Sequence, residues 1–230
     1  MKNKIILITG GSSGIGLSIA KSALLKNYIL INLSRTAEQS NLKNTKNYFA
    51  KNTDISDLKQ IESAKNWIIK KLNIKNIDVL INCAGTGFEK KISKITESDY
   101  YSIFDVNVKG LIFVTKSFYP LITKGTGIIC NISSIAGFKG FSKWSLYCAS
   151  KFAVEGFTSS LRNELREKKI RVFSVKPGSV DTPFYDYLPV SRKKNFIKPS
   201  TISKIVMDII DLPDDTCIED IFINNAAGDL

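Results

Sequence analysis

The chain has 230 residues, of which 43% are hydrophobic, and it carries a formal net charge of +12. A chain of this length suits one domain with a full hydrophobic core, so we expect a single domain over 1–230. No apolar stretch reaches the ~20 residues of a membrane-spanning helix, which argues against a membrane partner. A cytoplasmic location is the default expectation.

The content of histidine and cysteine narrows the chemistry. Histidine is absent, which excludes histidine-based catalytic triads and argues against a zinc site. The four cysteines are scattered along the chain without metal-ligand pairing. We therefore expect reduced, packed thiols and no bound metal.

The basic residues are spread along the chain rather than gathered in one block. Arginine and lysine number 33, against 21 acidic residues. This distribution is typical of solvated helix faces, so nucleic acid is not the expected partner. A basic surface would instead favour a polyanionic cofactor or an acidic carrier protein through long-range attraction.

Apolar, β-rich runs alternate with longer helical patterns. In chain order, the expected strands are 4–9, 28–33, 46–50, 77–82, 126–132, 170–175 and 220–224. The expected helices are 14–27, 57–73, 97–123, 147–168 and 200–211. This alternation predicts an α/β fold, a Rossmann-like doubly wound parallel sheet with helices on both faces. The stretch 183–199 is the least regular and reads as a loop or short helices near a site.

A glycine-rich turn joins the first strand to the first helix. It reads Thr9-Gly10-Gly11-Ser12-Ser13-Gly14-Ile15-Gly16. Glycine allows positive φ and a close approach of ligand to backbone, and a helix N-terminus attracts anions. In this position the turn predicts a phosphate-binding site, with an ordinary tight turn as the alternative.

A second motif lies at the start of the helix expected over 147–168. Tyr147 and Lys151 are four residues apart, which puts their Cβ atoms ~5–6 Å apart on one helix face. A free phenol titrates near ~10, and a neighbouring ammonium lowers that pKa. Ser134, thirteen residues before Tyr147, could hold a carbonyl oxygen beside the phenol. Such a set suits proton transfer to or from an oxygen on carbon, although the pair alone is common in helices.

Together these motifs resemble the short-chain dehydrogenase/reductase family over nearly the whole chain. The glycine spacing is followed, in the family's order, by Asp54-Ile55, Asn82-Cys83-Ala84-Gly85, Asn107, Ser134, Tyr147 with Lys151, and Pro177-Gly178. Cys83 stands where the family commonly has a second asparagine. The chain is also shorter than many members, mainly in its C-terminal half.

The resemblance implies a nicotinamide dinucleotide and the residues that bind it. These are Gly10, Ser12, Ser13, Gly14, Ile15, Gly16, Ser34, Arg35, Asp54, Ile55, Asn82, Ala84, Gly85, Tyr147, Lys151, Pro177, Gly178, Val180 and Thr182. The second strand ends without an acidic residue, whereas Ser34 and Arg35 suit a 2′-phosphate, so we expect NADP(H) over NAD(H). Arg35 as an ordinary loop cation, Asp54 as a turn residue and Asn82 as a link between strands are the alternatives.

The resemblance also implies the catalytic roles. Tyr147 would be the general acid in reduction, Lys151 would lower its pKa and bind the nicotinamide ribose, and Ser134 would position the substrate oxygen. Ser133 is the competing serine. Asn107 would hold a water of the proton relay, or else satisfy backbone groups inside a helix.

The substrate and the assembly are less defined. We expect substrate contacts from loop 183–199 and from an aromatic set that could equally make core or subunit contacts: Phe138, Phe141, Trp144, Phe184, Tyr185 and Tyr187. The apolar residues of helices 97–123 and 147–168 suggest a homodimer or homotetramer. The expected function is an NADP-dependent carbonyl reductase or alcohol dehydrogenase. A 3-oxoacyl-carrier-protein reductase is one form of it, and a non-catalytic dinucleotide sensor is the rival.

Overall fold

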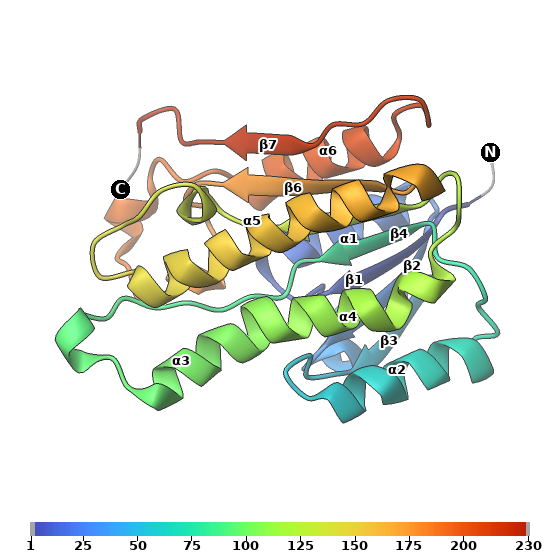
Figure 1. The fold of residues 1–230 in the computed structure, drawn as a ribbon, viewed down its shortest axis with the longest axis horizontal. Helices are drawn as coiled ribbons and strands as arrows, with labels where there is room; N and C mark the ends of the chain where they lie inside the picture. The colour runs from blue at the N-terminus through green and yellow to red at the C-terminus, as the bar shows by residue number, and fades with distance from the viewer. Residues whose placement is uncertain (1–2, 229–230) are drawn as a thin grey trace.

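A computed structural model describes residues 3–228 of the chain. Within these residues seven parallel strands form one sheet in the order β3-β2-β1-β4-β5-β6-β7 (Figure 1). The strands are β1 Ile5–Thr9, β2 Ile29–Ser34, β3 Tyr48–Asn52, β4 Val79–Asn82, β5 Ile128–Ile132, β6 Arg171–Pro177 and β7 Asp220–Ile223. The predicted Rossmann-like α/β fold is confirmed.

Helices cover both faces of the sheet. They are α1 Gly14–Leu25, α2 Leu58–Lys70, α3 Glu97–Phe104, α4 Leu111–Phe118, α5 Ser145–Leu165 and α6 Pro199–Ile210. Helices α1 and α6 pack on one face, and α2, α4 and α5 pack on the other (Figure 1). Side chains alternate along each strand, so Ile6 and Ile8 of β1 enter the first core while Leu7 enters the second. Burial on both faces explains why these strands are continuous apolar runs.

The helix expected over 97–123 is interrupted. Residues Asp105–Gly110 form a π-helical segment between α3 and α4, and the α-helix ends at Phe118. A π-helical segment carries an extra residue per turn and frequently occurs at functional sites. The apolar residues of 97–123 predict a helix but do not predict this local change in winding.

The remaining boundaries agree with the expected elements to within a few residues. Loop 183–199 contains two short 3-10 turns, Pro183–Tyr185 and Val190–Lys193, and α6 begins at Pro199. None of the helices among residues 3–228 has the length and apolar character to cross a bilayer.

The strand order defines where a ligand can enter. The chain runs outward from β1 to β3, and then β4 pairs with the other side of β1. Loops that leave β1 and β4 therefore turn in opposite directions and open a crevice at the carboxyl ends of the strands. The glycine turn and the start of α5 both lie at this edge of the sheet (Figure 1).

Candidate active site

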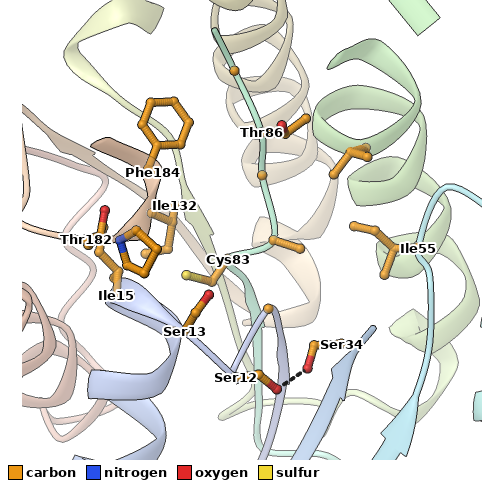
Figure 2. Close-up of a pocket in the computed structure, with 18 of the residues that line it drawn as sticks. Ser12, Ser13, Ile15, Ser34, Ile55, Cys83, Thr86, Ile132, Thr182 and Phe184 are labelled. Atoms are coloured by element: carbon orange, nitrogen blue, oxygen red, sulfur yellow. Dashed lines mark hydrogen bonds between the residues drawn. The ribbon is translucent and has the colours of Figure 1, made fainter. Parts of the chain in front are cut away.

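A cavity of about 730 Å³ lies at the carboxyl ends of the strands. It brings together every expected cofactor residue except Asn82, and it also contains Ser134. Figure 2 shows Ser12, Ser13 and Ile15 on the glycine turn, with Thr182 beside Ile15 and Phe184 farther from the turn. Residues far apart in the sequence thus line one space, because parallel strands end at the same edge.

The glycine turn is shaped by close backbone contacts. Gly10 has φ +71°, and a Cβ there would lie 2.8 Å from the Cα of Ala84. A Cβ at Gly16 would lie 2.2 Å from the carbonyl oxygen of Gly10. Neither position tolerates a side chain, so the backbone folds tightly against the start of α1. The free amides at that helix start form a cradle that fits the pyrophosphate of a dinucleotide.

Asn32 is a site residue that the sequence analysis missed. Its Oδ1 accepts a hydrogen bond from the Gly11 amide at 3.0 Å, and its Nδ2 donates to Ser12 at 3.2 Å and to Tyr48 at 2.8 Å. Ser12 in turn bonds Ser34 at 2.6 Å (Figure 2). The sequence gives one indication of this role: Asn32 stands alone among the apolar residues 29–33, and a buried side-chain amide needs hydrogen-bond partners.

The far end of the cavity carries Arg35 and Asp54. Arg35 is exposed beside Ser34 and lines the cavity, as expected for a residue that meets a phosphate. Asp54 also lines the cavity, while its Oδ1 accepts hydrogen bonds from the Ser56 amide at 2.9 Å and from the Ser56 hydroxyl at 2.7 Å. Asp54 is therefore both a turn residue and a residue of the cavity wall.

Asn82 does not line the cavity. Its Nδ2 donates to Thr115 at 3.0 Å and to Asn131 of β5 at 2.9 Å. The side chain thus links neighbouring strands and helix α4, which was the alternative interpretation. The structure does not support the expected cofactor contact of Asn82, because its buried amide bonds within the protein, whereas Cys83, Ala84 and Gly85 line the cavity.

Tyr147 and Ser134 meet at the inner end of the cavity. Tyr147 lies in the first turn of α5, and Ser134 follows the end of β5. The Ser134 hydroxyl hydrogen-bonds the phenol and so lowers its pKa. Ser133 has a buried hydroxyl oxygen without a hydrogen-bond partner in the described part of the chain. The geometry therefore favours Ser134 over Ser133.

Gly87 makes room for the phenol ring. A Cβ at this glycine would lie 2.4 Å from Cδ2 of Tyr147. Gly87 lines the cavity but was not among the expected site residues. The sequence signal was a second glycine two residues after Gly85, which is weak by itself.

Lys151 lies one helical turn beyond Tyr147 and is 6% exposed. Its Nζ donates to the carbonyl oxygen of Ile132 at 3.0 Å and lies 5.7 Å from the centre of the Tyr147 ring. Burial lowers the pKa of Lys151 to about 8, against a usual value of 10.5, while Cys83 and Glu155 raise it in part. The ammonium is thus held close to the phenol but directed at a backbone carbonyl.

The pKa of Tyr147 differs from the expected direction. Burial raises it well above the usual value, and the bond from Ser134 offsets only part of the rise. The expected lowering by Lys151 is therefore not found: desolvation of the phenolate dominates, and among the described residues it is Ser134, not Lys151, that lowers this pKa. Tyr147 is protonated at neutral pH and is equipped to donate a proton.

Asn107 lies in the π-helical segment and is 1% exposed. Its Oδ1 accepts from the Thr86 amide and its Nδ2 donates to the Thr86 carbonyl, both at 2.8 Å. The same Nδ2 donates to Ser150 at 3.0 Å, and Ser150 donates to the backbone oxygen of Tyr147 at 2.7 Å. Asn107 thus satisfies backbone groups, which agrees with the alternative given for it in the sequence analysis. It also joins the segment after β4 to the helix that carries Tyr147.

Only part of the expected aromatic set surrounds the site. Phe184 and Tyr185 line the cavity, and Trp144 stacks on Phe184 with ring centres 6.0 Å apart. Phe138 is 67% exposed and packs against Phe222 of β7, away from the cavity. Phe138 therefore lies outside this cavity, whereas Phe184 and Tyr185 line it as expected.

The sequence of this chain matches the model of one protein family. The model described as short chain dehydrogenase matches residues 4–191. The chain belongs to the short-chain dehydrogenase/reductase family. A sepiapterin reductase of Chlorobaculum tepidum is 30% identical to it over an alignment of 240 residues that covers 98% of each chain.

Solved structures of short-chain dehydrogenases share the fold. An alcohol dehydrogenase from the archaeon Thermococcus sibiricus, complexed with 5-hydroxy-NADP, has a TM-score of 0.87 at 24% identity and covers 98% of this chain and 97% of its own. A 3-ketoacyl-(acyl-carrier-protein) reductase from Brucella melitensis, complexed with NADH, has a TM-score of 0.87 at 22% identity, with 98% of both chains covered. As a member of the family, this chain is an oxidoreductase that acts with a nicotinamide dinucleotide.

Proposed function

We propose that this short-chain dehydrogenase reduces an uncharged ketone or aldehyde with NADPH, and that Tyr147 donates the proton. The observation that carries the proposal is the half-buried phenol of Tyr147, with Ser134 beside it at the inner end of a cavity that begins at the glycine turn. The bound nicotinamide supplies the hydride to the carbonyl carbon. Tyr147 gives its proton to the carbonyl oxygen, so the product is an alcohol.

The surrounding residues hold and polarise the substrate. Ser134 can donate a hydrogen bond to the same carbonyl oxygen, which stabilises the negative charge that develops there. Lys151, buried beside the phenol, stabilises the tyrosinate that remains after proton transfer. A positioned proton donor contributes ~10²–10⁴-fold to the rate.

The charges of the cavity support an uncharged substrate. Of the side chains that line it among the described residues, the charged ones are Arg35, Asp54 and Lys151. Arg35 and Asp54 follow β2 and β3 at the far end, so Lys151 is the one cation near the phenol. Phe184 and Tyr185 supply an apolar wall there. A substrate carboxylate would lose its hydration without gaining a partner of its own.

The end of β2 supports NADP(H). Ser34 and Arg35 line the cavity, and no acidic residue stands at this strand end to meet the ribose. A guanidinium pairs well with a phosphate, and an acidic residue would repel one. Among the solved structures, the Thermococcus enzyme is complexed with 5-hydroxy-NADP and the Brucella enzyme with NADH. Because these structures do not agree on the cofactor, the proposal of NADP(H) rests on Arg35.

Replacing Arg35 tests the choice of cofactor. We expect Arg35→Asp to lower kcat/KM for NADPH by about tenfold or more while that for NADH stays equal or rises. Lys43→Asp is the matched control, because Lys43 is exposed and lies outside the cavity. A wild-type preference for NADH, or equal losses in both variants, would contradict the assignment.

A substrate panel tests the reaction. NADPH consumption is measured with neutral ketones and aldehydes, with the matching oxo acids, and with 3-oxoacyl thioesters. We expect turnover of neutral carbonyls and at least tenfold lower kcat/KM for the oxo acids. The net charge of +12 favours one specific alternative, a 3-oxoacyl thioester on an acidic carrier. Preference for the carrier-bound thioester over the free one would identify it, and no turnover of any carbonyl would contradict the proposal.

A further inference from the structure

Asn225 lies just beyond the last strand, and its side chain reaches two other parts of the chain. It is 9% exposed although it sits two residues after the end of β7. Its Oδ1 accepts from the Ser179 amide at 2.9 Å, and its Nδ2 donates to the Ser179 carbonyl at 3.1 Å. The same Nδ2 donates to the carbonyl of Asn195 at 2.8 Å. One side-chain amide thus uses its acceptor and both of its hydrogens on backbone groups.

This arrangement extends the sheet beyond its last strand pair. Pro177 is the partner of Ile223 at the end of the ladder between β6 and β7, and the Gly178 amide donates to the Ile223 carbonyl at 2.8 Å. The amide of Asn225 then binds both backbone groups of Ser179, as a neighbouring strand would. The segment 178–182 lies beyond the ladder of β6 and β7, and it is held by this side chain on one side and by a bridge between Val180 and Ile197 on the other.

Ser179 is also where the loop 183–199 returns to the fold. The Ile197 amide donates to the Ser179 carbonyl and the Asp181 amide donates to the Ile197 carbonyl, each at 2.9 Å. Ser179 therefore joins three segments: the C-terminal turn, the cavity wall that includes Val180 and Thr182, and the end of the loop that carries Phe184.

Gly178 shows how closely the asparagines approach this wall. A Cβ at Gly178 would lie 2.5 Å from Oδ1 of Asn225 and 2.7 Å from Oδ1 of Asn224. The glycine after Pro177 thus makes space for the two amides, beyond any need of a turn. The wall also touches the glycine turn, because a Cβ at Gly14 would lie 3.2 Å from the Thr182 side chain.

We propose that Asn225 is a positioning residue, which fixes the wall of Val180 and Thr182 against the dinucleotide and ties the substrate loop 183–199 to that wall. The inference rests on the proposed function for its kinetic consequences, since Val180 and Thr182 face the cofactor cavity. Loss of the amide would remove the side chain that holds both the wall and the loop to the C-terminal turn, while the backbone bonds of Ile197 would still join the wall to the loop. The positions of the cofactor wall and of the loop are therefore coupled through Ser179 and the Asn225 side chain that binds it.

Three variants test the coupling. Asn225→Ala removes all three hydrogen bonds. Asn225→Asp keeps the size and the acceptor of the side chain but loses both of its donors. Asn224→Ala is the control, because the Asn224 side chain accepts from the backbone N–H of Asn225 and does not bond Ser179. We measure KM for NADPH and kcat separately, and the rate of tryptic cleavage in the loop, where Arg192 and Lys194 are exposed.

We expect both Asn225 variants to raise KM for NADPH and the loop-cleavage rate by about tenfold each, and the control to change either by less than about threefold. NADPH should slow cleavage in wild type and in the control but not in the Asn225 variants. A lowered melting temperature with unchanged KM and unchanged cleavage would overturn the proposal and leave Asn225 a merely structural residue.

Hydrogen exchange on the wild-type chain needs no variant and no turnover. The Ser179 and Ile197 amides should exchange as one slowly opening unit, and unequal opening of the two would overturn the proposal even if both variants failed to fold. If the wild type neither binds nor consumes NADPH, the proposed function fails, whereas the exchange and cleavage results still decide the structural coupling.

Discussion

At the scale of single residues, the site holds a phenol and an ammonium that are both displaced from their usual protonation behaviour. Burial raises the pKa of Tyr147 and lowers that of Lys151 to about 8. Both shifts have the same cause, since each charged form is desolvated. The buried ammonium reduces the stability of the fold, and the proposed reaction needs it where a tyrosinate would form. Such a conflict between stability and chemistry is common at functional sites.

Replacing Lys151 by methionine tests this conflict. The folded pKa of about 8 lies below the usual 10.5, so between these values the unfolded chain binds more protons and the wild type gains stability as pH rises. Near about pH 7 we expect the free energy of unfolding of Lys151→Met to equal that of wild type or to exceed it by up to ~3 kcal/mol. We expect the variant to be nearly inactive.

Thermal unfolding at several pH values measures the difference in stability between Lys151→Met and wild type. The stability advantage of Lys151→Met should shrink as pH rises from about 8 to about 10, because other groups titrate alike in both proteins and cancel in the difference. A variant that is less stable than wild type near neutral pH, and whose deficit shrinks with rising pH, would contradict the account.

At the scale of elements, the π-helical segment Asp105–Gly110 turns Asn107 toward the site. The amide of Asn107 satisfies both backbone groups of Thr86 and contacts Ser150 of α5. It therefore fixes the segment after β4, which lines the cavity, relative to the helix that carries Tyr147. π-helical segments of this kind frequently occur at functional sites.

Asn107→Ala tests the role of this contact. The variant leaves the Thr86 amide and carbonyl without their partner, so we expect a loss of about 1–3 kcal/mol in the free energy of unfolding and a marked loss of turnover. Ser150→Ala is the control, because it keeps both Thr86 bonds. Chemical denaturation should show a smaller loss for Ser150→Ala; equal losses would mean that the Thr86 contact has no special weight.

Much of the fold was predictable at this scale, because strands buried on both faces appear as short apolar runs and a parallel sheet needs helices between them. The glycine turn, Ser134, Tyr147 and Lys151 were predictable as residue types at fixed spacings. Asn32, Gly87 and Asn225 were not, because their roles depend on backbone groups that are distant in sequence. The alternatives for Phe138 and Asn82 could not be decided, because a sequence shows neither the direction of a side chain nor its partner.

At the scale of the whole molecule, the outer faces of α4 and α5 bear on assembly. Several apolar residues that suggested an oligomer are buried within the chain itself, namely Ile103, Leu111, Val114, Phe118, Val154 and Leu161. Phe152 of α5 remains 49% exposed. A homodimer or homotetramer stays a prediction, and it depends on the apolar surface that remains exposed on these helices, which includes Phe152.

Sedimentation tests the assembly. We expect wild type to sediment as a dimer or tetramer at micromolar concentration, and Phe152→Arg to shift it toward the monomer, because a charge would be buried in a symmetric interface. Leu25→Arg is the control, since Leu25 is 85% exposed on α1, which covers the opposite face of the sheet. A wild-type monomer, or dissociation by both variants alike, would refute the prediction.

The central claim is that Tyr147 gives the proton in an NADPH-dependent carbonyl reduction. Its most direct test compares wild type with Tyr147→Phe, by following NADPH oxidation in a single turnover on the best carbonyl substrate while measuring NADPH binding separately. The account predicts a rate lower by ~10²–10⁴-fold with the dissociation constant of NADPH nearly unchanged. An unchanged rate of turnover in Tyr147→Phe would contradict it.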